Sequence, residues 1–166
     1  MFYKCGHKHC SWDDVLYEST PKTIDGFKLR MCPTCGHPAY NYMEFCNASF
    51  LIRHPEYIFV FGDNLLRKGK GGAAKLRDEP NTYGFITKRY PDNKDSSFYK
   101  PEEYKAIFKK ELEKLETFCD KNNDKKILLS KIGAGLANKF NIWEEVIYPN
   151  IPRFIESRNI YKLWID

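Results

Sequence analysis

The segment YIFVFGDNLLRKGKGGAAKL, residues 57–76, joins an apolar run to a glycine-rich loop. The run at residues 57–61 has the length and the β-rich composition of a strand that is buried on both faces. In a parallel α/β sheet, ligands bind outside the carboxyl ends of the strands. We therefore expect a ligand-binding loop directly after this strand, within residues 62–76, and we call its glycine-rich part, residues 65–72, the first glycine loop.

From residue 83 to the end, the chain alternates between strand-like and helical patterns. A helix is expected from Pro101 to Cys119, because proline suits the first helical turn and apolar residues recur at helical spacing. A second helical pattern runs from Trp143 to Phe154, and the two prolines within it should kink or split it. This alternation predicts a layered α/β domain. The other short apolar runs of strand length are residues 83–87, 127–130 and 160–165.

A second glycine loop, residues 130–137, begins where the apolar run at residues 127–130 ends. Glycine removes side chains where backbone amides can approach a phosphate, and a helix that begins near Ala73 would favour an anion at its N-terminus. The spacing of Gly62, Gly69 and Lys70 matches neither a Walker loop nor the dinucleotide fingerprint. The first glycine loop alone could be a surface turn. Together, the two loops suit a diphosphate held from both sides.

Four cysteines near the N-terminus form two pairs. Cys5 and Cys10 have four residues between them, and Cys32 and Cys35 have two. Zinc prefers four tetrahedral thiolate or imidazole ligands, and two such pairs brought together by a hairpin supply them. We expect a structural zinc ion, because four protein ligands leave no open position for chemistry.

Two alternatives remain for the cysteine pairs. One histidine of the first pair, His7 or His9, could replace Cys10 as a ligand, or the four thiols could simply be buried as small apolar residues. With zinc, the metal would supply much of the stability of so short a segment. We expect a zinc-ribbon-like module over residues 1–46 and a second domain over residues 56–166.

Composition sets broad limits on the function. The 166 residues are 42% hydrophobic and 30% charged, which suits a soluble globular protein. No run approaches the roughly 20 apolar residues that a membrane span needs, and the N-terminus has no signal-peptide pattern. The sequence therefore predicts a cytoplasmic protein with no membrane partner. The net charge of +5 suits a partner that carries phosphates, although ordinary soluble proteins reach it too.

The two glycine loops together resemble those of the macro domain family. Residues 64–74 look like that family's Asn-Ala-Ala-Asn strand end followed by Gly-Gly-Gly-Val-Ala. Residues 132–136, with Trp143 and Val146 downstream, look like the second phosphate loop and helix of one branch. That branch includes terminal ADP-ribose glycohydrolases and antitoxins that remove ADP-ribose from DNA. The segment at residues 85–88 also fits it. The resemblance implies a macro-domain-like three-layer α/β/α sandwich behind the zinc-ribbon-like module.

The resemblance also implies which residues bind ADP-ribose. Asn64 would hold the distal ribose, and the diphosphate would lie between the two glycine loops. The family's aspartate for the adenine amino group has no counterpart in this sequence. The loop residues expected to bind are Gly69, Gly71, Gly72, Ala73, Ala74, Ile132, Gly133, Ala134, Gly135 and Leu136.

The resemblance identifies the catalytic residues less completely than the binding residues. Members of this branch that cleave ADP-ribose use a lysine soon after the first glycine loop, and some use an aspartate just after the second. Ala137 occupies the place of that aspartate. The candidates that remain are Asp63, Lys75 and Asp78. Alternatively, Lys75 and Asp78 form a solvated helix face, and Asp63 is a turn or capping residue.

Three functions fit these observations. The first is an ADP-ribosyl hydrolase that acts on ADP-ribosylated protein or nucleic acid. The second is a non-catalytic reader or sequestering protein for ADP-ribose or a related nucleotide, which the missing aspartate favours. In the third, the zinc-ribbon-like module binds nucleic acid, and the pocket acts on modified DNA or RNA.

Overall fold

The chain divides into two compact units. One comprises Met1–Phe45 with Leu163–Asp166, and the other comprises Cys46–Lys162. This computed structural model describes the backbone of residues 2–5, 9–10, 13–15, 22–24, 27–36, 38–41, 46–156 and 160–163. It describes the side chains of residues 9–10, 31–36, 46–152, 154, 160 and 163.

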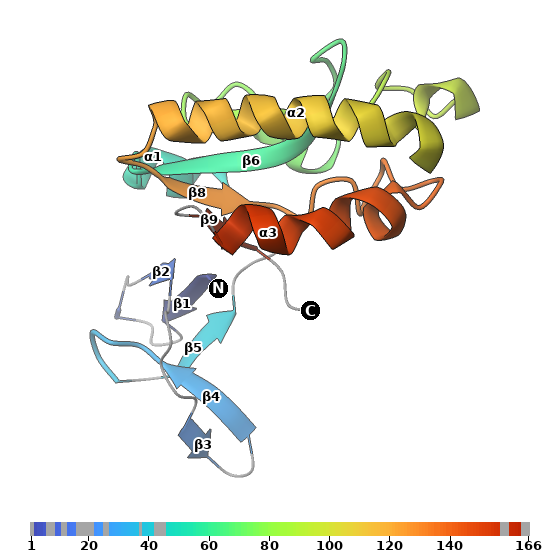
Figure 1. Cartoon of the computed structure of the whole chain (residues 1–166). Coiled ribbons are helices and arrows are strands. Elements are labelled where there is room, and N and C mark those ends of the chain that lie inside the picture. Colours follow the sequence, from blue (N-terminus) through green and yellow to red (C-terminus); the bar gives the residue numbers. More distant parts are fainter. Residues whose placement is uncertain are drawn as a thin grey trace. The chain divides into compact units, whose positions relative to one another are not determined.

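The N-terminal unit is built on short antiparallel strands (Figure 1). Their order in the sheet is β2-β1-β5-β4-β3. Strand β1 pairs with both β2 and β5, and Cys5 at its end lies opposite Ala39. The strands are β1 (Phe2–Cys5), β2 (Asp13–Val15), β3 (Lys22–Ile24), β4 (Phe27–Met31) and β5 (Pro38–Asn41).

The second unit contains a small parallel sheet in the order β7-β6-β8-β9. The strands predicted at residues 57–61, 83–87 and 127–130 are confirmed. The last strand covers only the start of the run predicted at residues 160–165, and residues 164 and 165 of that run lie outside the described part. The strands are β6 (Tyr57–Asn64), β7 (Thr82–Lys88), β8 (Lys126–Leu129) and β9 (Ile160–Lys162).

The predicted helix after β7 is α2 (Pro101–Lys121). It begins at proline, and the Glu103 carboxylate accepts a hydrogen bond from the backbone N–H of Lys100 at 3.2 Å. The second predicted helix is divided, as its prolines indicated, into a π-helical turn η3 (Trp143–Ile147), a 3₁₀ turn η4 (Tyr148–Asn150) and α3 (Ile151–Glu156). The remaining helices are α1 (Ala48–Arg53), η1 (Gly72–Leu76) and η2 (Asp95–Ser97).

Helix α2 also supports the edge strand of the parallel sheet. At β7, the Tyr104 hydroxyl donates to the carbonyl of Ile86 at 2.7 Å, and the backbone N–H of Ile86 donates to the Glu111 carboxylate at 3.3 Å. Strand β7 lies at the edge of the sheet, so these bonds satisfy backbone N–H and C=O groups that have no neighbouring strand on that side. The unit is thus a mixed α/β structure. Among the helices of the described residues, none combines the length and apolar character that a membrane span requires.

Candidate functional site

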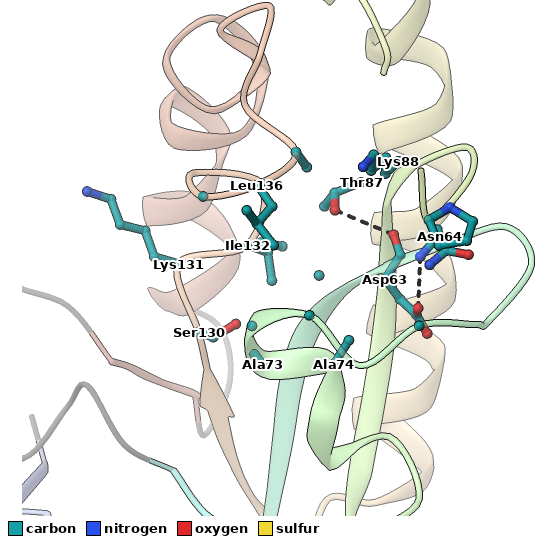
Figure 2. A pocket seen from close by; sticks show the side chains of 18 of the residues that line it. Asp63, Asn64, Ala73, Ala74, Thr87, Lys88, Ser130, Lys131, Ile132 and Leu136 are labelled. Carbon is teal, nitrogen blue, oxygen red and sulfur yellow. Dashed lines mark hydrogen bonds between the residues drawn. The ribbon is translucent and has the colours of Figure 1, made fainter. Parts of the chain in front are cut away.

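A cavity of about 330 Å³ lies at the carboxyl ends of β6, β7 and β8. Its volume falls at the lower end of the usual range of small-molecule sites. Figure 2 shows the second glycine loop on one side, the ends of β6 and β7 on the other, and Ala73 and Ala74 of η1 between them. This is the edge at which a parallel sheet binds ligands.

The structure brings nearly all of the predicted loop residues to this cavity. Ala134 is the exception, since its N–H closes a turn onto the carbonyl of Lys131 at 3.2 Å and it does not line the space. The predicted binding residues that line the cavity are Asn64, Gly69, Gly71, Gly72, Ala73, Ala74, Ile132, Gly133, Gly135 and Leu136.

The predicted catalytic residues are placed differently. Lys75 is exposed on η1 and does not line the cavity. Asp78 is also exposed, and its carboxylate pairs with the Lys70 ammonium at 3.1 Å. Only Asp63 of this set reaches the cavity wall. The geometry therefore agrees with the alternative that Lys75 and Asp78 belong to a solvated surface.

Two glycines allow the walls of the cavity to approach one another. A Cβ atom at Gly62 would lie 3.0 Å from the Thr87 hydroxyl and 3.6 Å from the backbone nitrogen of Gly133. Gly133 has a positive φ of 77°, and a Cβ there would lie 2.4 Å from Ile147. A larger residue at Gly62 would press on Thr87 of β7, and one at Gly133 would clash with Ile147 and be strained by the positive φ.

The two glycine loops also approach each other at the side chain of Leu136. Its δ-carbon lies 3.3 Å from the position of a Cβ at Gly71. Leu136 is nevertheless 73% exposed. An exposed apolar side chain thus reaches across the cavity, from one glycine loop to the other.

Asp63 is held in a network of hydrogen bonds. Its carboxylate, 1% exposed, accepts bonds from Arg77 at 2.6 and 3.2 Å and from Arg67 at 3.3 Å. The backbone N–H of Asn64 donates to it at 2.8 Å. Burial alone would raise the pKa of Asp63, but the bonds from Arg77 and Asn64 outweigh it and hold the pKa below the ordinary value. Asp63 is therefore a fixed anion with an anchoring role in the fold.

The pKa of Asp63 predicts a change in stability at low pH. A lowered pKa means that the ionised group stabilises the fold above about pH 4, and that this stability is lost as the pH falls through the folded-state pKa. Asp63→Asn should therefore lower the free energy of unfolding by about 3 kcal/mol at pH 7. The difference from the wild type should narrow at pH 3. Denaturant unfolding at both pH values measures it, and an equal difference at both would contradict the assignment.

The side chain of Asn64 is engaged mainly with its own loop. Its amide donates to the carbonyl of Lys68 at 2.7 Å and accepts from the backbone N–H of Leu66 at 3.1 Å. These bonds close the turn at the start of the first glycine loop. An asparagine amide carries two hydrogens and an oxygen with two lone pairs, so capacity remains for a ligand.

Thr87 and Lys88, at the end of β7, are cavity residues that the sequence patterns do not indicate. Lys88 is only 9% exposed, and its ammonium lies 4.3 Å from the centre of the Phe98 ring. Burial lowers the pKa of Lys88, although the nearby charge of Asp92 opposes this effect. Within the described part of the chain, no carboxylate lies within ion-pair distance of this ammonium.

The charge of the cavity wall is positive. Lys68, Lys88 and Lys131 line it, and the one carboxylate among its described lining residues is Asp63. That carboxylate is already balanced by two arginines. Lys131 contributes less, because its side chain extends away from the cavity in Figure 2 and its ammonium lies 5.3 Å from the Trp143 ring. Lys88 is therefore the buried cation of the site.

The N-terminal unit holds a separate cluster of thiols. The sulfur atoms of Cys10, Cys32 and Cys35 all lie within 4.8 Å of one another, so these three residues could hold a metal ion. A tight turn supports the cluster, because the N–H of Gly36 donates to the carbonyl of Cys32 at 2.9 Å and Gly36 has a φ of 72°.

The other predicted or possible metal ligands are not all described. The side chain of Cys5 and the whole of His7 lie outside the described residues. His9 is described and exposed, and it is not part of the thiol cluster. Three of the four predicted ligands are thus brought together.

The fold and the cavity define a mixed α/β protein with a positively charged site between two glycine loops. The chain belongs to a family of unknown function, DUF7831, which matches residues 41–139. Both glycine loops and strands β6 to β8 lie within the matched segment. Comparisons with curated proteins and with solved structures find no match.

Proposed function

We propose that the protein binds the ADP-ribosyl group in this cavity and hydrolyses its linkage to a protein or nucleic acid. One observation carries the proposal: a buried lysine, Lys88, lines the same cavity as two glycine loops at the carboxyl edge of a parallel sheet. Glycine loops offer backbone N–H groups to a diphosphate. A buried ammonium adds a charge that water screens little.

Lys88 is the group that we assign to the chemistry. Hydrolysis requires water to attack the anomeric carbon of the distal ribose, while the bond to the leaving oxygen breaks. Lys88 would donate its proton to that oxygen and regain one from the attacking water. A lysine whose pKa is lowered by burial gives up its proton more readily than an exposed one, which suits general acid catalysis.

The resemblance to macro domains supports the same proposal. We infer that the second unit has the macro-domain type of fold, with the two glycine loops in the order that the family shows. The cavity at the carboxyl ends of β6, β7 and β8, lined by both loops, supports this inference. The catalytic lysine is then Lys88 rather than Lys75, and Asp63 supports the site without taking part in the reaction.

A reader without catalytic activity is the second candidate. The described lining residues include no carboxylate outside the Asp63 network, and Ala137 occupies the place of the aspartate that some macro-domain hydrolases use. A hydrolase that needs a carboxylate to activate water would lack it here. Tight binding of ADP-ribose without turnover of an ADP-ribosylated substrate would favour this candidate.

For the thiol cluster, we propose a structural zinc ion bound by Cys10, Cys32, Cys35 and Cys5. Two sulfur atoms on one tetrahedral zinc, each about 2.3 Å from the metal, lie about 3.8 Å apart. The sulfur atoms of Cys10 and Cys32 are separated by 3.8 Å. Four thiolates leave no open coordination position, so the zinc would stabilise the N-terminal unit and take no part in hydrolysis.

Titration with ADP-ribose tests the cavity directly. The wild-type protein is expected to bind with an affinity on the order of micromolar, measured by calorimetry. Gly71→Glu should weaken binding by at least about 10-fold, because it places a carboxylate beside a diphosphate. Gly71 has an ordinary φ of −74°, and a Cβ there meets only the flexible end of Leu136.

The matched control is Gly71→Gln, which has the same size and no charge. It should weaken binding less than Gly71→Glu does. Equal losses in the two variants would show that bulk alone blocks the cavity, and would remove the support for a diphosphate there. A wild-type protein that does not bind ADP-ribose would refute the proposed ligand.

A further inference from the structure

Arg77 connects the buried carboxylate of Asp63 to the first glycine loop. Its guanidinium bonds both oxygens of that carboxylate, at 2.6 and 3.2 Å. The same group donates to two backbone carbonyls of the loop, that of Gly69 at 2.5 Å and that of Lys68 at 3.3 Å. The planar fork of arginine makes such simultaneous contacts possible, and a lysine ammonium could not reproduce them.

These two carbonyl contacts fix the orientation of two peptide groups in the cavity wall. In a trans peptide, the carbonyl and the N–H point in opposite directions. The carbonyls of Lys68 and Gly69 point to Arg77, so the N–H groups of Gly69 and Lys70 point away from it. Lys68 and Gly69 line the cavity, whereas Arg77 does not.

A loop of this composition needs such a restraint. Glycines at positions 69, 71 and 72 give it more backbone freedom than any other residue would. A ligand that has to order a mobile loop binds more weakly by the free energy of that ordering. A guanidinium that already holds the loop removes this penalty before the ligand arrives.

We propose that Arg77 is a positioning residue that, with Asp63 as its counter-ion, holds the first glycine loop in the shape that accepts a diphosphate. The identity of the ligand rests on the proposed function, but the restraint on the loop does not. Arg77 touches no ligand in this role. It acts only through the carbonyls of Lys68 and Gly69.

The test variant is Arg77→Lys, which keeps a positive charge beside Asp63 and loses the carbonyl fork. Its affinity for ADP-ribose should fall by about 10-fold or more, which corresponds to about 1.4 kcal/mol. Amide hydrogen exchange should become faster in the first glycine loop of the unliganded protein. If Arg77 only stabilised the fold, Arg77→Lys would lower the melting temperature without a selective increase in hydrogen exchange at this loop.

Asn81→Ala supplies the matched control. The Asn81 side chain also holds backbone carbonyls, those of Leu51 and Tyr57 at 3.0 Å each, but at the amino end of β6. This variant should lower the melting temperature while leaving ADP-ribose affinity and exchange in the first glycine loop unchanged.

The outcomes separate the two proposals. Unchanged exchange in the first glycine loop of Arg77→Lys would overturn the positioning role, whatever the ligand is. Faster loop exchange with no ADP-ribose binding by the wild type would retain the positioning role and refute the proposed ligand. Equal loss of affinity in Arg77→Lys and Asn81→Ala would mean that general stability controls binding, and would also overturn the inference.

Discussion

Replacing Lys88 with methionine is expected to lower the rate of hydrolysis by about 10² to 10⁴, the range that general acid catalysis contributes. Methionine retains a long apolar side chain that can pack against Phe98, so the fold should persist. The measurement is the release of free ADP-ribose, followed by mass spectrometry. The substrates are a mono-ADP-ribosylated protein and a mono-ADP-ribosylated DNA oligonucleotide.

Lys131→Met is the control for this experiment. Lys131 also lines the cavity, but its ammonium lies over the Trp143 ring, outside the space. The control should therefore keep most of the wild-type rate. Full activity of Lys88→Met would refute the assignment of Lys88, and a wild type that binds ADP-ribose without releasing it from either substrate would favour the reader.

The pH dependence of the reaction gives a second check on Lys88. A general acid must be protonated, so the rate should fall as the pH rises through the pKa of Lys88. Burial lowers that pKa, so the fall should occur below the range in which an ordinary lysine titrates. This decline should be absent from the residual activity of Lys88→Met.

The sequence predicted the sheet and its ligand-binding edge because both depend on local patterns. Strands buried on both faces are apolar runs, and β6, β7 and β8 each show one. Because parallel strands end at one edge, the loops that follow β6 and β8 had to meet there. The macro-domain architecture is more specific than a mixed α/β fold, and it stays a proposal.

The chemistry of the site depends on contacts that no local pattern contains. Lys88 is buried because the loop after β7 returns to place Phe98 against its ammonium. Asp63 is neutralised by Arg77, 14 residues further along the chain. Neither contact leaves a trace in the hydrophobic periodicity, so the sequence could not indicate Lys88 as a site residue or exclude Asp63 as a catalytic one.

Helix geometry explains the placement of Lys75. The sequence indicated that a helix begins near Ala73, and η1 (Gly72–Leu76) does so as a 3₁₀ turn. A 3₁₀ turn has 3.0 residues per turn instead of 3.6, so its side chains project in different directions from those of an α-helix. In this turn, Ala73 and Ala74 line the cavity and Lys75 faces solvent.

Removing zinc is expected to unfold the N-terminal unit and to leave residues 46–162 folded. The strands of that unit are three to five residues long, too short to form a large apolar core. Structural zinc contributes about 10–16 kcal/mol of binding free energy in small domains, so a chelator should remove most of the stability. The readouts are zinc content by mass spectrometry and the sites of limited proteolysis before and after chelation.

Cys32→Ser and Cys46→Ser form the matched pair for this prediction. Cys32 belongs to the thiol cluster, and its loss should lower the zinc content well below one ion per chain. Burial raises the pKa of the Cys46 thiol to about 12, so it stays protonated and is a poor metal ligand at neutral pH. Cys46→Ser should therefore keep a full zinc content.

Equal zinc content in the Cys32→Ser and Cys46→Ser variants would refute the thiol cluster as the metal site. Cleavage that is unchanged after complete removal of zinc would show that the N-terminal unit folds without the metal.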